Sequence, residues 1–170
     1  MKTAVFIDGA NLSYACAKAG YRIDFKKLKK MWQPPLRLTY YTATLRKPDG
    51  DDPHSKIKDY LEYNGYSVVT KECKYFSDPL TGLTKVKGNM DIEIVVDMLT
   101  SCRFYDNLVL FSGDGDFTYA VKECQRNGAT VTVGSVMDLA ADELRRQCDT
   151  FIDLNSPIMR ERLELKRETR

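Results

Sequence analysis

Two short apolar segments of this 170-residue chain each end in side chains that can bind a metal ion. The run 109–111 leads into Ser112-Gly113-Asp114-Gly115-Asp116, and the run 4–7 leads into Asp8-Gly9-Ala10-Asn11. Each apolar run predicts a buried strand, and the glycines allow the backbone to turn sharply after it. Because ligands of open parallel sheets bind beyond the carboxyl ends of the strands, we expect both sets of carboxylates in one acidic pocket.

A third acidic element follows the basic segment Lys85-Val86-Lys87-Gly88-Asn89. We expect Asp91 in the first turn of a helix, on the face that it shares with Val95 and Met98. This face should be buried, so Asp91 begins an inward face near the end of the sheet. Asp97 lies roughly 240° around the helix from Asp91, which favours a structural or salt-bridging role for it.

An acidic pocket needs a metal ion or a cationic substrate to relieve the repulsion between its carboxylates. Oxygen ligands favour Mg²⁺ or Mn²⁺, and such ions can activate water and stabilise the oxygens of a phosphodiester. The single histidine and the widely spaced cysteines exclude a zinc site of the usual type. The chain also lacks the phosphate-binding glycine-rich motif of P-loop enzymes.

Lys85 and Lys87 stand just before the Asp91 helix. They either contact substrate phosphates beside the metal site or belong to an ordinary solvated loop, and the sequence leaves both interpretations open. Asp8 and Asp114 likewise have a purely structural alternative, because an aspartate that follows a strand can cap a helix.

Apolar and polar patterns along the chain predict strands that alternate with helices. This alternation predicts a three-layer α/β/α fold with a mostly parallel central sheet, covered by helices on both faces. The segment 71–88 is expected to be a basic loop or hairpin. Residues 1–156 should form one domain, and 157–170 a charged C-terminal helix or tail that is exposed. The expected strands are 3–7, 36–45, 66–70, 107–112, 129–134 and 151–154, and the expected helices are 11–19, 24–32, 53–64, 90–102, 117–126 and 138–147.

Composition narrows the class of protein further. A hydrophobic fraction of 43% and a charged fraction of 29% are ordinary for a globular protein. The net charge of +2 gives no global basic field, so any binding of nucleic acid must come from local patches. The five cysteines are odd in number and widely spaced, which predicts reduced thiols rather than disulfides. Because the sequence also shows no secretion signal and no membrane-spanning run, we expect a cytoplasmic protein. The oligomeric state stays open, a homodimer included.

Three blocks in this order resemble a NYN domain, the LabA-like branch of the PIN-like nucleases. They are Phe6-Ile7-Asp8-Gly9-Ala10-Asn11, Lys87-Gly88-Asn89-Met90-Asp91 and Ser112-Gly113-Asp114-Gly115-Asp116-Phe117. The resemblance covers about residues 3–154 and implies a PIN-like α/β fold that cleaves RNA with Mg²⁺ or Mn²⁺. It places the catalytic and metal-binding acids at Asp8, Asp91, Asp114 and Asp116, with Asn11 and Ser112 as substrate-side neighbours.

Two other functions compete with a ribonuclease. A non-catalytic RNA-binding or regulatory protein could keep the fold, although none of the four acidic positions is substituted here. A metal-dependent adhesion module of the von Willebrand A type would need Asp-x-Ser-x-Ser after the first strand, where this chain has Asp8-Gly9-Ala10-Asn11-Leu12.

Overall fold

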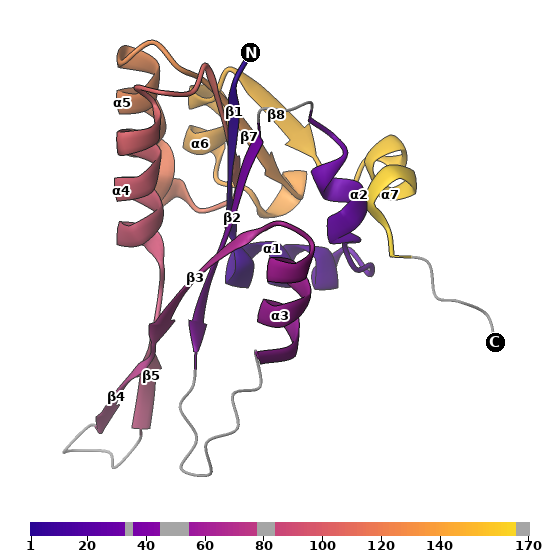
Figure 1. Ribbon diagram of the computed structural model, residues 1–170, viewed down its shortest axis with the longest axis vertical. Helices are drawn as coiled ribbons and strands as arrows, with labels where there is room; N and C mark the ends of the chain where they lie inside the picture. The colour runs from indigo at the N-terminus through magenta and orange to yellow at the C-terminus, as the bar shows by residue number, and fades with distance from the viewer. Residues whose placement is uncertain (33–35, 45–54, 78–83, 166–170) are drawn as a thin grey trace.

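The central feature of the fold is a six-stranded sheet in which every neighbouring pair of strands is parallel (Figure 1). Its strand order is β3-β2-β1-β6-β7-β8. The structure is a computed structural model that describes residues 1–32, 36–44, 55–77 and 84–165. The expected α/β/α fold is confirmed, with an all-parallel main sheet.

The sheet strands are β1 (Thr3–Asp8), β2 (Leu36–Thr44), β3 (Ser67–Glu72), β6 (Asn107–Phe111), β7 (Thr130–Ser135) and β8 (Thr150–Asp153). The helices are α1 (Gly9–Lys18), α2 (Phe25–Lys29), α3 (Ser55–Tyr63), α4 (Asp91–Ser101), α5 (Thr118–Arg126), α6 (Asp142–Gln147) and α7 (Pro157–Leu163). Two short 3₁₀ helices are η1 (Gly115–Phe117) and η2 (Met137–Leu139). The last residue of the strand expected at 36–45 and the first two residues of the helix expected at 53–64 lie outside the described residues.

The sheet is apolar on both faces, as a parallel sheet between two helical layers must be. All five residues of β6 are buried. Val109 and Phe111 pack in the core on one face, whereas Leu108 and Leu110 pack in the core on the other. This alternation follows from the two-residue period of a strand.

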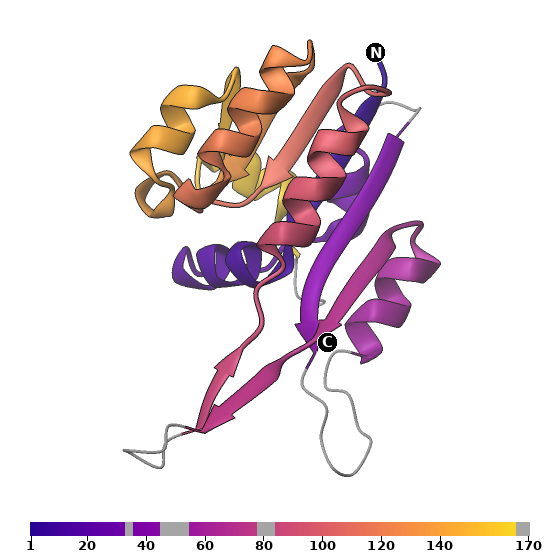
Figure 2. The ribbon, with the colours of Figure 1, turned by 90° about the vertical axis from the view of Figure 1, so that its left-hand side faces the viewer.

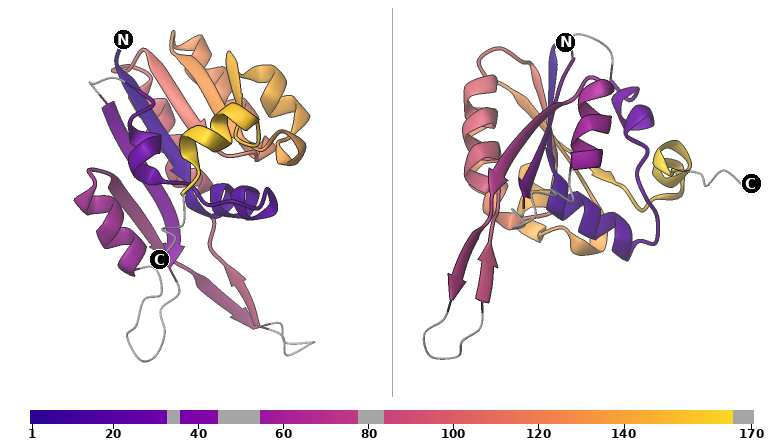
Figure 3. Two further views of the ribbon diagram at one scale, coloured as in Figure 1. Left: turned by 90° about the vertical axis from the view of Figure 1, so that its right-hand side faces the viewer. Right: turned by 60° about the horizontal axis from the view of Figure 1, so that its bottom comes forward.

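Each face has its own group of helices. Helices α4, α5 and α6 cover one face (Figure 2). Helices α1, α2, α3 and α7 lie on the other (Figure 3), where Leu12, Leu28, Leu61 and Leu163 are buried. No helix in the described ranges is long and apolar enough to cross a membrane.

The segment 71–88 contains a hairpin. Strand β4 (Lys74–Ser77) pairs antiparallel with β5 (Thr84–Lys87), and the two strands project from the body of the molecule (Figure 1). The hairpin connects β3 to α4, so it leads directly to Asp91.

Three expected elements differ from the structure. The helix expected at 138–147 is broken, because Ala140 and Ala141 are extended and the Ala141 N–H donates to the Gly113 carbonyl at 2.9 Å. The helix expected at 24–32 ends at Lys29, where α2 closes with a turn. The tail is not wholly exposed, since Met159 and Leu163 of α7 are buried against the core.

Candidate metal centre

The carboxyl edge of the sheet brings the acidic segments together. β1 and β6 are neighbours, with Ile7 opposite Phe111, so the residues that follow both strands emerge side by side. Asp8 is the last residue of β1, and Asp114 follows β6 by three residues. α4 packs beside β1 and begins at Asp91. Three separate elements therefore deliver carboxylates to one place.

Asp91, Asp114 and Asp116 form the tightest group. One carboxylate oxygen from each lies within 4.8 Å of the other two. A divalent ion bound to oxygens at roughly 2.0–2.6 Å holds its ligands at separations of this size. The donor set consists of carboxylates alone, and Asp91 and Asp114 are half-buried while Asp116 is exposed. This group fits a hard divalent cation such as Mg²⁺ or Mn²⁺.

Asp8 lies beside this group without belonging to it. Its Oδ1 accepts a hydrogen bond from the Asn11 N–H at 3.1 Å and caps α1. Its Oδ2 accepts from the Ser112 hydroxyl at 3.2 Å. Burial raises the pKa of Asp8, and the nearby charge of Asp114 raises it further. Asp8 thus holds local structure and also adds negative charge to the site.

Asp91 experiences the combined repulsion of the cluster. Burial raises its pKa, and the charges of Asp8, Asp114 and Asp116 raise it further. The Asn89 side-chain amide donates to Asp91 Oδ2 at 2.5 Å. A bound cation would relieve the part of this pKa rise that comes from the neighbouring carboxylates.

The loop 112–116 is held rigidly by its own side chains and by α1. The Asn11 side-chain oxygen accepts from the Gly113 N–H at 2.8 Å, and Ser112 Oγ accepts from the Asp114 N–H at 3.3 Å. Asp114 Oδ1 accepts from the Asp116 N–H at 3.0 Å. Asn11 and Ser112 therefore lie beside the acidic residues, and their hydrogen bonds position the acidic loop.

Close packing leaves little room for a side chain in this loop, most strictly at Gly113, where the neighbours include backbone atoms. A Cβ atom at Gly113 would lie 2.7 Å from Ser135 Oγ and 3.0 Å from the Leu139 carbonyl oxygen. A Cβ at Gly115 would lie 2.5 Å from a carboxylate oxygen of Glu143. The loop is thus pressed against the η2–α6 segment, which fixes Asp114 and Asp116 from behind.

The structure also places residues at the site that the sequence did not single out. Lys71, near the end of β3, forms a salt bridge with Glu93 at 2.9 Å and donates to the Asn89 carbonyl at 3.2 Å. Its charge offsets a small part of the rise that burial and the neighbouring carboxylates cause in the pKa of Asp91. The exposed carboxylate of Glu143 lies against the backbone of the acidic loop. The sequence predicts a strand that ends at residue 70, whereas β3 continues to Glu72 and carries Lys71 to the start of α4.

The remaining predicted residues lie as follows. Lys85 and Lys87 are in β5, of which the structure describes the backbone alone. Asp97 is not part of the acidic group, because its Oδ2 accepts a hydrogen bond from the Tyr41 hydroxyl at 2.6 Å. The structural role that the helical spacing favoured for Asp97 is therefore observed.

Fold and site together place the chain in a known family. The profile of the NYN domain matches residues 2–155, and the protein belongs to the NYN domain family. It is similar to the low amplitude and bright protein LabA of Synechococcus elongatus, with 37% identity over 159 residues that cover 91% of this chain and 84% of LabA. A crystal structure of a protein of unknown function from Vibrio parahaemolyticus has the same fold, with a TM-score of 0.74 and 25% identity over 90% of this chain and 92% of that one.

Proposed function

We propose that this protein is a metal-dependent ribonuclease that hydrolyses phosphodiester bonds of RNA. The observation that carries the proposal is the convergence of Asp91, Asp114 and Asp116 within 4.8 Å, with Asp8 beside them. The NYN family supports the same activity, because its PIN-like fold is that of nucleases. The alternative is a non-catalytic RNA-binding or regulatory protein that keeps the fold.

The roles of the residues follow from where they lie. Asp91, Asp114 and Asp116 would hold Mg²⁺ or Mn²⁺, and Asp8 would complete the negative site. Such an ion, when bound, acidifies a water molecule and offsets charge on the phosphodiester. Asn11 and Ser112 keep the acidic loop in place through the hydrogen bonds given above. The ammonium group of Lys71 stands close enough to Asp91 to attract a phosphate that approaches the cluster.

Cleavage of RNA by the purified protein tests this proposal. We expect a labelled mixture of RNAs to be cleaved with Mn²⁺ and to remain intact with chelator. Asp114→Asn should reduce single-turnover cleavage by two or more orders of magnitude, since it removes a ligand charge but keeps an oxygen that can accept from the Asp116 N–H. Its melting temperature without metal should stay within a few degrees of the wild type.

A matched control separates the site from a general loss of charge. Asp59 is exposed on α3, so Asp59→Asn makes the same chemical change away from the cluster and should cleave normally. If Asp114→Asn cleaves as fast as Asp59→Asn, the catalytic role is refuted. If the wild type binds RNA but does not cleave it in Mn²⁺, the non-catalytic alternative holds.

We propose that Lys85 and Lys87 contact backbone phosphates, because β5 leads through residues 88–90 to Asp91. Replacing both with alanine should weaken binding equally across RNA sequences. The slope of log affinity against log salt should flatten by about 1.4, the value expected for two contacts to a single strand. The double replacement of Lys26 and Lys30, at α2, is the control, and an equal slope in both variants would contradict the proposal.

A further inference from the structure

A cavity of about 930 Å³ has Gly9 and Ala10, the two residues that follow Asp8, in its lining. Its walls come from α1, from α3, from the carboxyl half of β2 and from the segment that joins α1 to α2. Side chains of Phe25, Tyr40, Ile57 and Tyr60 give it a largely apolar and aromatic lining. None of the metal-site carboxylates lines it, so it is a separate feature of the same edge of the molecule.

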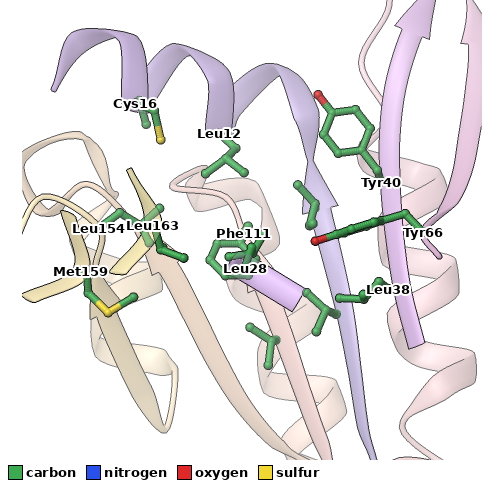
Figure 4. Packing of buried hydrophobic residues seen from close by; sticks show 14 of the residues in the cluster. Leu12, Cys16, Leu28, Leu38, Tyr40, Tyr66, Phe111, Leu154, Met159 and Leu163 are labelled. Atoms are coloured by element: carbon green, nitrogen blue, oxygen red, sulfur yellow. The ribbon is translucent and has the colours of Figure 1, made fainter. Parts of the chain in front are cut away.

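Tyr40 lines the cavity where it meets the first turn of α1. Its ring lies across Gly9, where a Cβ atom would come within 2.5 Å of the ring. Figure 4 shows Tyr40 beside the first turn of α1. Asp8 caps that same turn, and the negative charge of Asp8 contributes to a raised pKa of Tyr40, after the larger effect of burial. Gly9 and Ala10 line the cavity, so its wall begins one residue after Asp8.

The chemistry of the lining selects a neutral, planar group. The charged residues among the described lining are Arg22 and Asp24, whose charges are opposite. A phosphate would gain little there, whereas a flat ring can pack against Phe25 and Tyr60, with the buried Tyr40 behind them in the wall. Phe25 and Tyr40 already meet edge to face, with ring centroids 5.7 Å apart. Tyr60 keeps 37% of its surface exposed and is free to stack on an incoming ring.

We infer that this cavity receives unpaired nucleobases of the RNA whose backbone phosphate lies at the acidic cluster. The inference rests on the proposed function for the nature of the substrate, and it adds where the unpaired bases of that RNA bind. A base in a duplex must be unpaired and unstacked, at a cost in free energy, before it can enter a cavity, whereas the bases of a single strand are free to stack on aromatic side chains. The described lining contains no side-chain amide, so we expect little preference among bases.

Binding measurements with defined probes test the inference. The probes are free adenosine, a ten-nucleotide oligoadenylate, its duplex with oligouridylate, and an abasic strand of equal length. We expect adenosine to shift NMR signals of Tyr40 and Tyr60, and the oligoadenylate to bind more tightly than the duplex or the abasic strand. Tyr60→Ala should weaken oligoadenylate binding by about tenfold, the loss of one stacked base, and leave abasic binding unchanged.

Two pairs of variants provide matched controls. Tyr63 is 92% exposed on the same helix as Tyr60 and does not line the cavity, so Tyr63→Ala should bind like the wild type. Ser13 lines the cavity and Tyr14 does not, so Ser13→Trp should block it and Tyr14→Trp should not. Titration calorimetry with Mn²⁺ should give equal affinities for all four variants, which also shows that each one is folded.

The outcomes separate this inference from the proposed function. If adenosine binds and Ser13→Trp abolishes its binding, the base site stands even where Mn²⁺-dependent cleavage is absent. If Tyr60→Ala and Ser13→Trp bind oligoadenylate like their controls, the base site is refuted even where cleavage is present. If Ser13→Trp instead changes the sedimentation coefficient with RNA affinity intact, a second copy of the chain occupies the cavity and the inference is overturned.

Discussion

Two carboxylates of the candidate metal centre also cap helices. Asp8 accepts from the Asn11 N–H at the start of α1, and Asp114 accepts from the Asp116 N–H at the start of η1. The structural and the metal-binding interpretations of these residues are therefore compatible. The caps fix the carboxylates in a geometry in which they repel one another, so the local fold holds together a group of charges that is unfavourable without a cation.

The repulsion predicts how acid affects the protein without metal. Because the pKa of Asp91 is raised in the folded state, its contribution to stability is greatest below the ordinary aspartate pKa and is lost as the pH rises through the folded value. Asp91→Asn should therefore melt at a higher temperature than the wild type at pH 7 in chelator. The difference should shrink as the pH falls, because Asp91 itself takes up a proton as the pH passes below its raised pKa.

Asp59→Asn provides the control for this measurement, because Asp59 is exposed on α3. Its difference from the wild type should vary little over the same pH range. A stabilisation by Asp91→Asn that is equal at pH 7 and pH 4 would show that the repulsion among Asp8, Asp91, Asp114 and Asp116 does not limit the stability of the fold.

At the scale of elements, α4 carries Asp91 and is anchored to the sheet through its middle. Tyr41 of β2 is fully buried under α4, and its hydroxyl donates to Asp97 at 2.6 Å. Ile94 and Met98 pack on the same face. The Tyr41–Asp97 hydrogen bond thus connects β2, which neighbours β1, to the helix that presents Asp91 at the acidic cluster.

We expect Tyr41→Phe to lower the free energy of unfolding by about 1.5–3 kcal/mol, the range for a hydrogen bond to a charged group. Urea unfolding measures this change. Tyr119 is 70% exposed on α5, so Tyr119→Phe should leave the midpoint unchanged. A Tyr41→Phe protein as stable as the Tyr119→Phe protein would show that α4 is held by apolar packing alone.

The alternation of elements was predictable from the sequence, because apolar strands and amphipathic helices differ in period. The break at Ala140 and Ala141 was not, since alanine favours helix and only the distant Gly113 carbonyl extends the backbone there. Tertiary contacts also determine where short elements such as α2 end.

In the candidate site, too, some residues were predictable from local patterns and others were not. Asp8, Asp91 and Asp114 were predictable because each lies at the end of a strand or the start of a helix. Lys71 and Glu143 reach the site through the register of β3 with β2 and through the packing of α6 on the acidic loop. Such contacts join segments far apart in the chain, and no local pattern encodes them.

At the scale of the whole molecule, residues 163–165 after α7 pair with residues 22–24, which lie between α1 and α2. The Asp24 N–H donates to the Leu163 carbonyl at 2.7 Å, and the Leu165 N–H donates to the Arg22 carbonyl at 2.7 Å. Ile23 and Glu164 form an antiparallel bridge, and α7 packs beside α2 (Figure 3). The family match ends at residue 155, so α7 and residues 163–165 lie beyond it, whereas residues 22–24 lie within it. We propose that the folding unit extends to Leu163.

Truncating the buried side chain of α7 tests this extent. Leu163 is fully buried among core residues of the face that α1 and α2 cover, so Leu163→Ala should lower the free energy of unfolding by about 2–5 kcal/mol. Ile158 is 65% exposed on the same helix, and Ile158→Ala should cost less than about 0.5 kcal/mol.

Urea unfolding gives both values, and hydrogen exchange at the Asp24 and Leu165 amides reports the pairing of residues 163–165 with residues 22–24. If Leu163→Ala speeds exchange at these two amides without lowering the unfolding midpoint, α7 docks on a domain that folds without it. A single lowered transition instead requires that α7 folds together with the sheet that positions the acidic cluster.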